Sequence, residues 1–191
     1  MKKYSAALLF CSAFAAFAVC AAPETFTLEP SHVYPHWSVR HMGFSQLQGQ
    51  FNTTSGKFTL DRVAHSGQVD AVIDAASLDS GHAKRDQHLK GEEFFNVAKF
   101  STITFHASNT RWDGDRLVAV DGEVTVLGVT KPVSLTVTNM ACGENPMAKT
   151  QYRCGFDANA TVKRSDFGMN YGLPHIGDEV LLTFEVEGIR D

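Results

Sequence analysis

Histidine is the residue type in this sequence that most invites a chemical hypothesis, because eight are present. The densest group is His32, His36 and His41. Their spacing matches no recognised metal motif, and two of them share a strand face only if no bulge intervenes. We therefore expect structural or surface roles for these side chains, and we predict no bound metal.

A second polar group, Arg85, Asp86 and His88, could supply a general acid or base if its members faced one pocket. On a helix, however, Arg85 and His88 share a face and Asp86 lies off it. We expect instead that Arg85 or Asp86 pairs with Arg164 or Asp166 and holds a cap on the rest of the fold. Hydrogen bonds to the head group of a ligand are the alternative role.

Enzyme motifs are missing from the sequence. It contains no nucleophile elbow, no glycine-rich phosphate loop and no paired metal-binding cysteines. The sequence therefore predicts no catalytic residue, no required cofactor and no enzyme. A hydrolase or isomerase that acts on a lipid through Arg85, Asp86 and His88 is the weaker alternative.

The N-terminus has the features of a secretory signal peptide. In order, it has basic, apolar and small residues: Lys2 and Lys3, a run from Ala6 to Val19, then Ala21 and Ala22. The run of about 14 residues is too short for a membrane-spanning helix, which needs roughly 20. We predict cleavage after Ala22, export to the periplasm and no stable membrane insertion. A lipoprotein anchor at Cys20 is the alternative, and Val19 disfavours it because that cut normally follows a small residue.

Cleavage would leave residues 23–191, a natural length for one domain. Removal of Lys2 and Lys3 changes the formal charge from −4 to −6. An acidic chain without a basic run does not complement a phosphate backbone, so nucleic acid is not expected as a partner.

Two of the four cysteines, Cys142 and Cys154, would remain after cleavage. Because an exported protein reaches an oxidising compartment, we predict a disulfide between them. Residues 143–146 are expected to form the turn of the hairpin that this bond staples, and closure of so short a loop adds roughly 3 kcal/mol. The alternative is two free buried thiols.

Alternation of apolar and polar residues, the period of a strand with one buried face, dominates from Leu47 onward. The expected strands are 47–51, 58–60, 69–73, 103–105, 118–126, 133–137, 156–162 and 180–186, with others near Phe26 and at 37–41. Turn residues separate them at 54–56, 66–67, 113–115 and 127–128. The pattern predicts an all-β fold of about eight antiparallel strands. A sheet of that length tends to close into a barrel, because closure removes its edges.

One segment interrupts this pattern. Ser80 can cap a short helix over about residues 82–90, and Gly91 can end it. Phe94 and Phe95 follow at once. We expect this helix to cover one mouth of the barrel.

The interior of an eight-stranded barrel is either filled by its own side chains or holds one small ligand. The side chains that we assign to the inward face are aliphatic, aromatic or small, without a lone charge, and would suit an alkyl or isoprenoid chain. The predicted lining is Phe44, Leu47, Phe51, Phe58, Ala71, Ile73, Leu89, Phe94, Phe95, Ile103, Phe105, Val120, Val124, Leu135, Phe156, Ala158, Phe167, Met169, Leu182 and Phe184. The alternative is a filled barrel in a stress-related protein whose outer surface binds a partner.

Four stretches of the sequence also carry a family resemblance. They are His32 to Phe51 with Trp37, Gly43 and Gly49; Ser77 to Phe105 with Arg85, Asp86, His88, Phe94 and Phe95; Gly122 to Pro132; and Arg164 to Val180 with Asp166, Phe167 and Gly177. Together they resemble the YceI-like family of periplasmic polyisoprenoid-binding proteins. The second stretch is the most specific of the four.

The resemblance implies an extended lipocalin-like barrel with a capping helix, which binds a polyisoprenoid chain such as that of a quinone and has no established chemistry. The sequence departs from the family at Glu29, Val33 and Ser101, where aspartate, serine and proline are usual. These departures leave the choice of ligand open. Edge strands near the N-terminus are compatible with a homodimer.

Overall fold

A computed structural model describes residues 22–191, so the predicted signal peptide, apart from Ala22, lies outside the described residues. The strands are β1 (Glu24–Val33), β2 (His36–His41), β3 (Ser45–Phe51), β4 (Thr54–Asp61), β5 (Ser66–Asp74), β6 (Leu78–Asp79), β7 (Thr102–Asp113), β8 (Arg116–Val126), β9 (Val129–Asn145), β10 (Ala148–Lys163) and β11 (Ile176–Arg190). The helical segments are η1 (Ala75–Ser77), α1 (Ala83–Leu89) and η2 (Arg164–Phe167).

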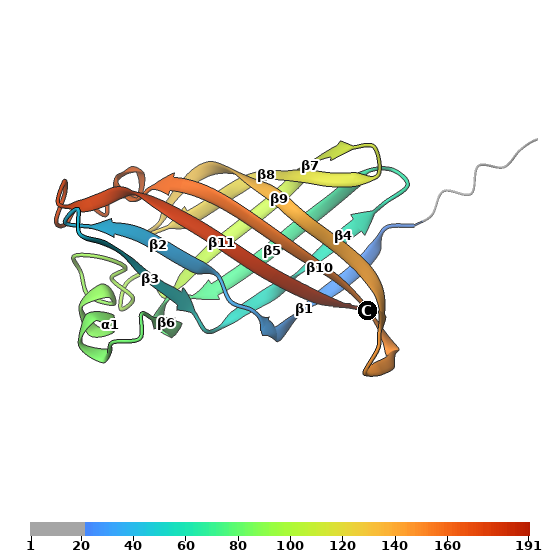
Figure 1. The fold of residues 1–191 in the computed structure, drawn as a ribbon, viewed down its shortest axis with the longest axis horizontal. Coiled ribbons are helices and arrows are strands. Elements are labelled where there is room, and N and C mark those ends of the chain that lie inside the picture. The colour runs from blue at the N-terminus through green and yellow to red at the C-terminus, as the bar shows by residue number, and fades with distance from the viewer. Residues whose placement is uncertain (1–21) are drawn as a thin grey trace, which may run out of the picture.

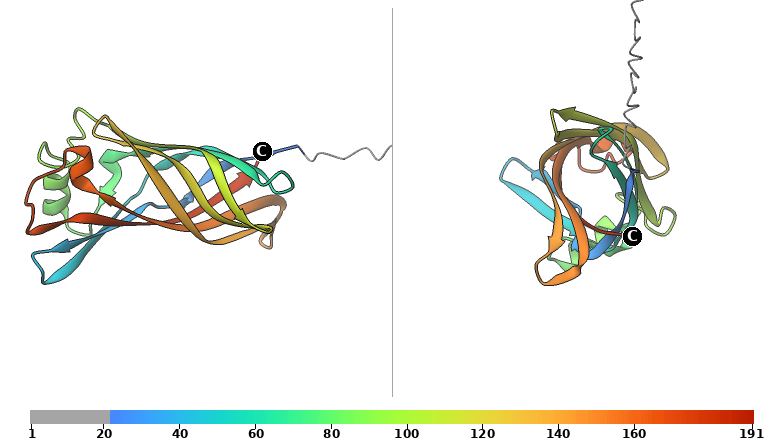
Figure 2. Two further views of the ribbon diagram at one scale, coloured as in Figure 1. Left: turned by 90° about the horizontal axis from the view of Figure 1, so that it is seen from above. Right: turned by 90° about the vertical axis from the view of Figure 1, so that its right-hand side faces the viewer.

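Eight of these strands form a closed antiparallel barrel, as predicted. Neighbouring strands follow the order β1-β4-β5-β7-β8-β9-β10-β11, and β1 also pairs with β11, which closes the ring. The ribbon is elongated along the barrel axis (Figure 1), and a view along that axis shows the strands surrounding it (Figure 2). Closure leaves each of these strands with a partner on both sides, so the alternating apolar face has only the interior to occupy.

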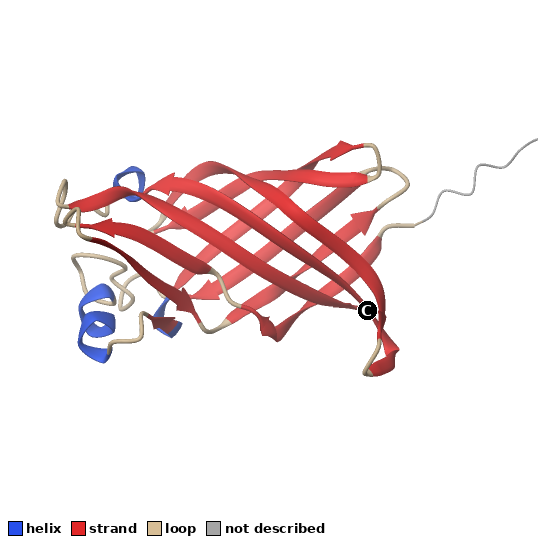
Figure 3. Ribbon diagram, in the orientation of Figure 1, coloured by secondary structure: helices blue, strands red, loops and turns tan. Residues whose placement is uncertain are grey.

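The strand that pairs with β11 changes along the length of β11. Residues 186–190 of β11 pair with β1, whereas residues 176–183 pair with β2. The β2–β3 hairpin therefore extends the wall at one end, and β3 continues to the two-residue strand β6. The helical segments gather at that same end (Figure 3), so the predicted capping helix is present.

Turns and bulges account for local differences from the predicted pattern. The turns at Asp113–Asp115 and Leu127–Gly128 are present, and both Leu127 and Gly128 have positive φ, as a tight hairpin turn requires. Gly56, in contrast, lies inside β4, where a Cβ would come within 2.1 Å of the Asp70 carbonyl oxygen. The predicted turn at residues 54–56 is therefore wrong; Gly56 reflects a close backbone approach.

A second difference concerns Val118, which has the same parity as the inward-facing Val120 and Val124 of the predicted strand 118–126 but does not line the cavity. The β7–β8 ladder changes register between Arg111 and Trp112, and such a bulge reverses the facing of the residues beyond it. Leu117 consequently becomes the buried residue. A bulge depends on two strands together, so the alternation of one strand could not reveal it.

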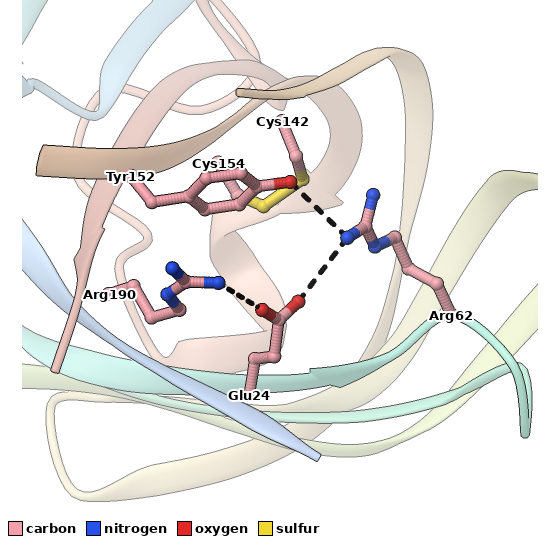
Figure 4. Close-up of a disulfide and its surroundings, with 6 residues drawn as sticks. All are labelled: Glu24, Arg62, Cys142, Tyr152, Cys154 and Arg190. Atoms are coloured by element: carbon pink, nitrogen blue, oxygen red, sulfur yellow. Dashed lines mark hydrogen bonds and ion pairs between the residues drawn. A yellow bond between two sulfur atoms is a disulfide. The ribbon is translucent and has the colours of Figure 1, made fainter. Parts of the chain in front are cut away.

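The predicted disulfide joins Cys142 in β9 to Cys154 in β10, two residues that lie directly opposite each other in the ladder. Residues 143–145 continue β9, so the hairpin turn lies around Pro146 and Met147, later than predicted. Around the bond, Glu24 accepts hydrogen bonds from Arg190 at 2.7 Å and from Arg62 at 3.4 Å (Figure 4). The first and last strands are thus tied together beside the staple.

Buried aromatic side chains pack together inside the barrel near the disulfide. Phe26 stacks on Phe58 with ring centroids 4.8 Å apart, and Phe58 meets Phe156 edge-on at 5.1 Å. We call this region the stapled end, defined by the disulfide and its surrounding cluster of Phe26, Leu28, Val33, Phe58 and Leu60. The opposite region, the cap end, comprises residues 40–46, 75–101, 127–131 and 163–179.

Candidate ligand-binding cavity

An elongated cavity of about 380 Å³ lies inside the barrel. Its walls come from every strand of the barrel, because the inward parity of each strand is apolar. Aliphatic and aromatic side chains make up nearly the whole lining, from Leu28 and Leu60 at the stapled end to Phe94 and Tyr171 at the cap end. The volume lies within the range of small-molecule binding sites, roughly 300–1,000 Å³.

Nineteen of the twenty residues predicted to line the barrel interior lie on the cavity wall. They are Leu47, Phe51, Phe58, Ala71, Ile73, Leu89, Phe94, Phe95, Ile103, Phe105, Val120, Val124, Leu135, Phe156, Ala158, Phe167, Met169, Leu182 and Phe184. Their contact with a ligand stays a prediction.

Phe44 is the exception. Phe44 is 89% exposed and lies outside the cavity. Met42 and Gly43 both have positive φ and turn the chain from β2 into β3, so Phe44 belongs to the turn and not to the alternating strand. Placing Phe44 on the inward face was therefore wrong.

The strongest omission from the predicted lining is Trp37, a buried residue of β2. Its indole lies over Gly49 of β3, where a Cβ would come within 2.3 Å of the ring. The sequence carried a signal for this packing, since a glycine in a strand often marks a close approach. Val39 was missed on the same strand as Trp37, where no lining residue was predicted. Other missed lining residues share the parity of predicted ones in their own strands: Val69, Val126, Val133, Val137, Val162, Val180 and Val186.

Two polar atoms on the cavity-lining residues have no hydrogen-bond partner among the residues that the structure describes. They are Trp37 Nε1 and Thr54 Oγ1, and both are buried. Buried polar groups usually find partners, so each such exception calls for an explanation. Neither atom has appreciable accessible surface, so neither is open to the cavity itself.

The polar cluster of the cap makes its contacts within the cap itself. Asp86 accepts hydrogen bonds from the backbone N–H and the hydroxyl of Ser80, and Arg85 donates to the Ser80 hydroxyl and carbonyl at 2.8 and 2.7 Å. The predicted pairing of Arg85 or Asp86 with Arg164 or Asp166 is therefore wrong. These contacts hold Ser80 to the side of α1, and His82 occupies the N-cap position predicted for Ser80.

Arg164 is a buried cation at the cap end of the cavity. Its guanidinium donates to the carbonyl oxygens of Met169, Ile176 and Gly177 at 2.8–2.9 Å, and burial lowers its pKa. The expectation of an interior without a lone charge thus fails here. Three carbonyl dipoles compensate the cation and fix the segment between η2 and β11.

Asp178 supports the same segment from outside the cavity. Its carboxylate accepts hydrogen bonds from the backbone N–H and hydroxyl of Ser165, and the backbone bond is the main reason that its pKa lies below the usual value. Asp166, predicted as a cap contact, is exposed. The sequence therefore identified the right segment but the wrong acidic residue.

Aromatic and imidazole rings meet where the cavity reaches the cap end. The ring centroid of Tyr171 lies 5.3 Å from the ring centroids of both Phe94 and His88. His88 Nε2 lies 2.6 Å from a carboxylate oxygen of Glu93. Tyr171 lines the cavity although it is 44% exposed, as does the partly exposed His88. These two side chains mark the mouth of the cavity at this end.

The three histidines singled out by the sequence have separate surroundings. His32 contacts Glu29, His36 lies 3.1 Å from Glu185, and His41 faces the cavity. Hydrogen bonds from Ser31 and then from His32 lower the pKa of Glu29 from 4.5 to about 2. Within residues 22–191, no group of three or more His, Cys, Asp or Glu residues is placed to hold a metal ion.

Of the described helices, none combines the length and apolar character needed to cross a lipid bilayer.

Comparison with known proteins places these features in a family context. The family model described as the YceI-like domain matches residues 26–188. A UPF0312 protein of Pseudomonas aeruginosa is 38% identical over 192 residues, covering 100% of this chain and 99% of the relative. Among solved structures, BcnA of Burkholderia cenocepacia aligns with a TM-score of 0.70 and 23% identity, over 84% of this chain and 98% of that chain.

A further solved structure is described as a polyisoprenoid binding domain from Saccharophagus degradans implicated in plant cell wall breakdown. It aligns with a TM-score of 0.64 and 16% identity, over 87% of this chain and 98% of that chain. At these identities, the two structures show that the fold is shared.

Proposed function

The chain belongs to the YceI-like domain family, and from this premise we propose that it is an exported carrier that holds a long apolar lipid, a polyisoprenoid or an isoprenoid quinone, inside its barrel. The observation that carries the proposal is the elongated cavity with its apolar walls. A flexible isoprenoid chain matches such a space, because it buries hydrocarbon without requiring polar partners along its length.

The cavity also favours this function over that of a filled barrel with an active outer surface. Small residues such as Ala71 and Ala158 stand on the inner wall beside large ones, and the core clusters leave open space between them. The structural relative described as a polyisoprenoid binding domain supports the same ligand class.

Export to the periplasm forms part of the proposal. The predicted signal peptide and the disulfide between Cys142 and Cys154 both suit an oxidising compartment outside the cytoplasm. The carrier role requires no catalytic residue, and the polar side chains of the cap are engaged in holding Ser80 and the segment after η2 in place.

Organic extraction of protein purified from its native periplasm, followed by mass spectrometry, tests the proposal. We expect a stoichiometric isoprenoid or quinone. Protein that carries no lipid and also fails to bind added isoprenoid alcohols and quinones would overturn the carrier function and favour the surface-interaction alternative.

Two neighbouring residues of β5 offer a matched pair of variants. Ala71 lines the cavity, whereas the adjacent Val72 points outward and is exposed. Ala71→Phe should reduce the bound lipid by filling the lumen, and Val72→Phe should leave it unchanged. Equal lipid content in the two folded variants would contradict binding inside the barrel.

A further inference from the structure

The β2–β3 turn displays two apolar side chains to solvent. Met42 is 53% exposed and Phe44 is 89% exposed. The turn itself is well fixed: Met42 N donates to the His175 carbonyl at 2.7 Å, Phe44 N donates to the His41 carbonyl at 3.0 Å, and Arg40 donates to the Gly43 carbonyl at 2.9 Å. These hydrogen bonds hold the two side chains outward in a defined position.

The turn lies beside the mouth of the cavity. His41, which precedes it, pairs with Ile176, and both residues line the cavity. The partly exposed Tyr171 belongs to the segment that leads to Ile176. The β2–β3 turn, α1 and the segment before β11 project together at one end of the barrel (Figures 1 and 2).

Charge is distributed unevenly between this end and the rest of the protein. The cap end carries eight Lys and Arg side chains against seven Asp and Glu, a net charge of +1. The rest of residues 23–191 carries seven basic against fourteen acidic side chains, a net charge of −7. An anionic surface would therefore repel the barrel body and tolerate only the cap end.

We propose that the cap end docks on the surface of a phospholipid bilayer, with Phe44 and Met42 inserted at the interface. This inference rests on the proposed carrier function and adds the surface at which the lipid would be exchanged. Two side chains on one turn can bury far less surface area than the roughly 800 Å² that each partner buries in a stable protein–protein interface. Insertion into lipid requires no matching surface; burial of apolar side chains drives it, and the small net charge of the cap end does not oppose it.

The docked orientation would turn the mouth of the cavity toward the membrane. The rim formed by Tyr171, Phe94 and His88 lies on the same end as the inserted turn. An isoprenoid chain could then pass between bilayer and barrel with little exposure to water, which removes the main cost of moving a long apolar chain.

Vesicle flotation of the full-length mature protein tests the docking. The probe is liposomes of phosphatidylethanolamine and phosphatidylglycerol in a three-to-one ratio, made without isoprenoid. Phe44→Ser should weaken vesicle binding by about tenfold or more, as expected for loss of a buried phenylalanine. The matched control is Met147→Ser, because Met147 is 95% exposed but lies in the β9–β10 turn near the disulfide.

Unchanged binding of Phe44→Ser, or equal loss in Met147→Ser, would overturn the docking. Extraction of bound lipid from Phe44→Ser separates the two proposals, because Phe44 lies outside the cavity and its loss should leave lipid content unchanged. Protein that carries isoprenoid but ignores vesicles would refute docking alone. Vesicle binding that depends on Phe44, in a protein that carries no isoprenoid and also binds none when it is added, would support docking and refute the carrier function.

Discussion

The two ends of the barrel are built on different principles. At the stapled end, stacked phenylalanines pack in the interior, Cys154 is fully buried, and β9 and β10 pair continuously around the disulfide from Tyr152 to Asp157. At the cap end, a seven-residue helix without a buried residue covers the opening, and polar side chains hold irregular segments in place. From this difference we expect that one end maintains the fold and that a ligand enters the cavity at the other.

Strand pairing reinforces this contrast. β10 pairs with β11 through eleven residues, whereas β3 meets β6 through two. Local opening requires less free energy where few paired residues and few buried side chains must separate. We therefore expect fluctuations that admit a ligand to occur at the cap end.

Truncation of the aromatic cluster should have the largest effect on stability. Phe58→Ala removes a ring that contacts both Phe26 and Phe156, and should lower the free energy of unfolding by about 3–5 kcal/mol. Phe95→Ala, its cap-end counterpart, should cost less because Phe95 is only partly buried, but should speed lipid release. Urea unfolding and lipid-release kinetics measure the two effects; equal losses of stability would remove the proposed distinction.

Loss of the disulfide should weaken only the stapled end. Replacing Cys142 and Cys154 together by alanine should lower the free energy of unfolding by roughly 3 kcal/mol, because the unfolded chain gains loop entropy. Lipid content of the folded protein should stay unchanged. Calorimetry and extraction of the same samples provide the measurement, and lipid loss without a drop in stability would contradict it.

Arg164→Met should have an intermediate effect confined to the cap end. The change leaves the carbonyls of Met169, Ile176 and Gly177 without their donor, at a cost of roughly 2 kcal/mol. Hydrogen exchange should accelerate in residues 164–178 and remain unchanged around the disulfide. Uniform acceleration through the barrel would show that the two ends do not open separately.

The smallest effect is expected from Glu29→Gln beside the stapled end. Because the folded-state pKa of Glu29 is about 2 and its ordinary value is 4.5, the charged form stabilises the fold above pH 4.5. That contribution disappears as the pH falls from 4.5 toward 2. At neutral pH the variant should be less stable by up to about 1 kcal/mol. Its free energy of unfolding should also fall less steeply between pH 4.5 and pH 2. Urea titrations at several pH values check this; parallel curves would contradict the assignment.

The lining of the barrel could be predicted because alternation is a property of each strand by itself. Ala71, Phe105 and Leu182 were placed correctly on the cavity wall from parity alone. Phe44 failed because the residues before it turn the chain, and Val118 failed because a bulge requires knowledge of the partner strand.

The cap contacts could not be read in the same way. Arg164 binds backbone carbonyls, which every residue possesses, so no side-chain pattern identifies its partners. Ser80 and Asp86 were both noticed in the sequence, but the bond between them depends on how the chain bends into α1. Sequence motifs thus located the functional end without revealing its internal connections.

The cavity also has a limited depth, since at the stapled end it finishes among residues that include Leu28 and Leu60. A lipid chain that entered from the cap end could fill no more than this depth, so that any further length would remain outside. The protein would then distinguish its ligands by the length of their chains. Short isoprenoids would disappear inside, and longer ones would leave their last units at the mouth, where a membrane or another carrier could take hold of them.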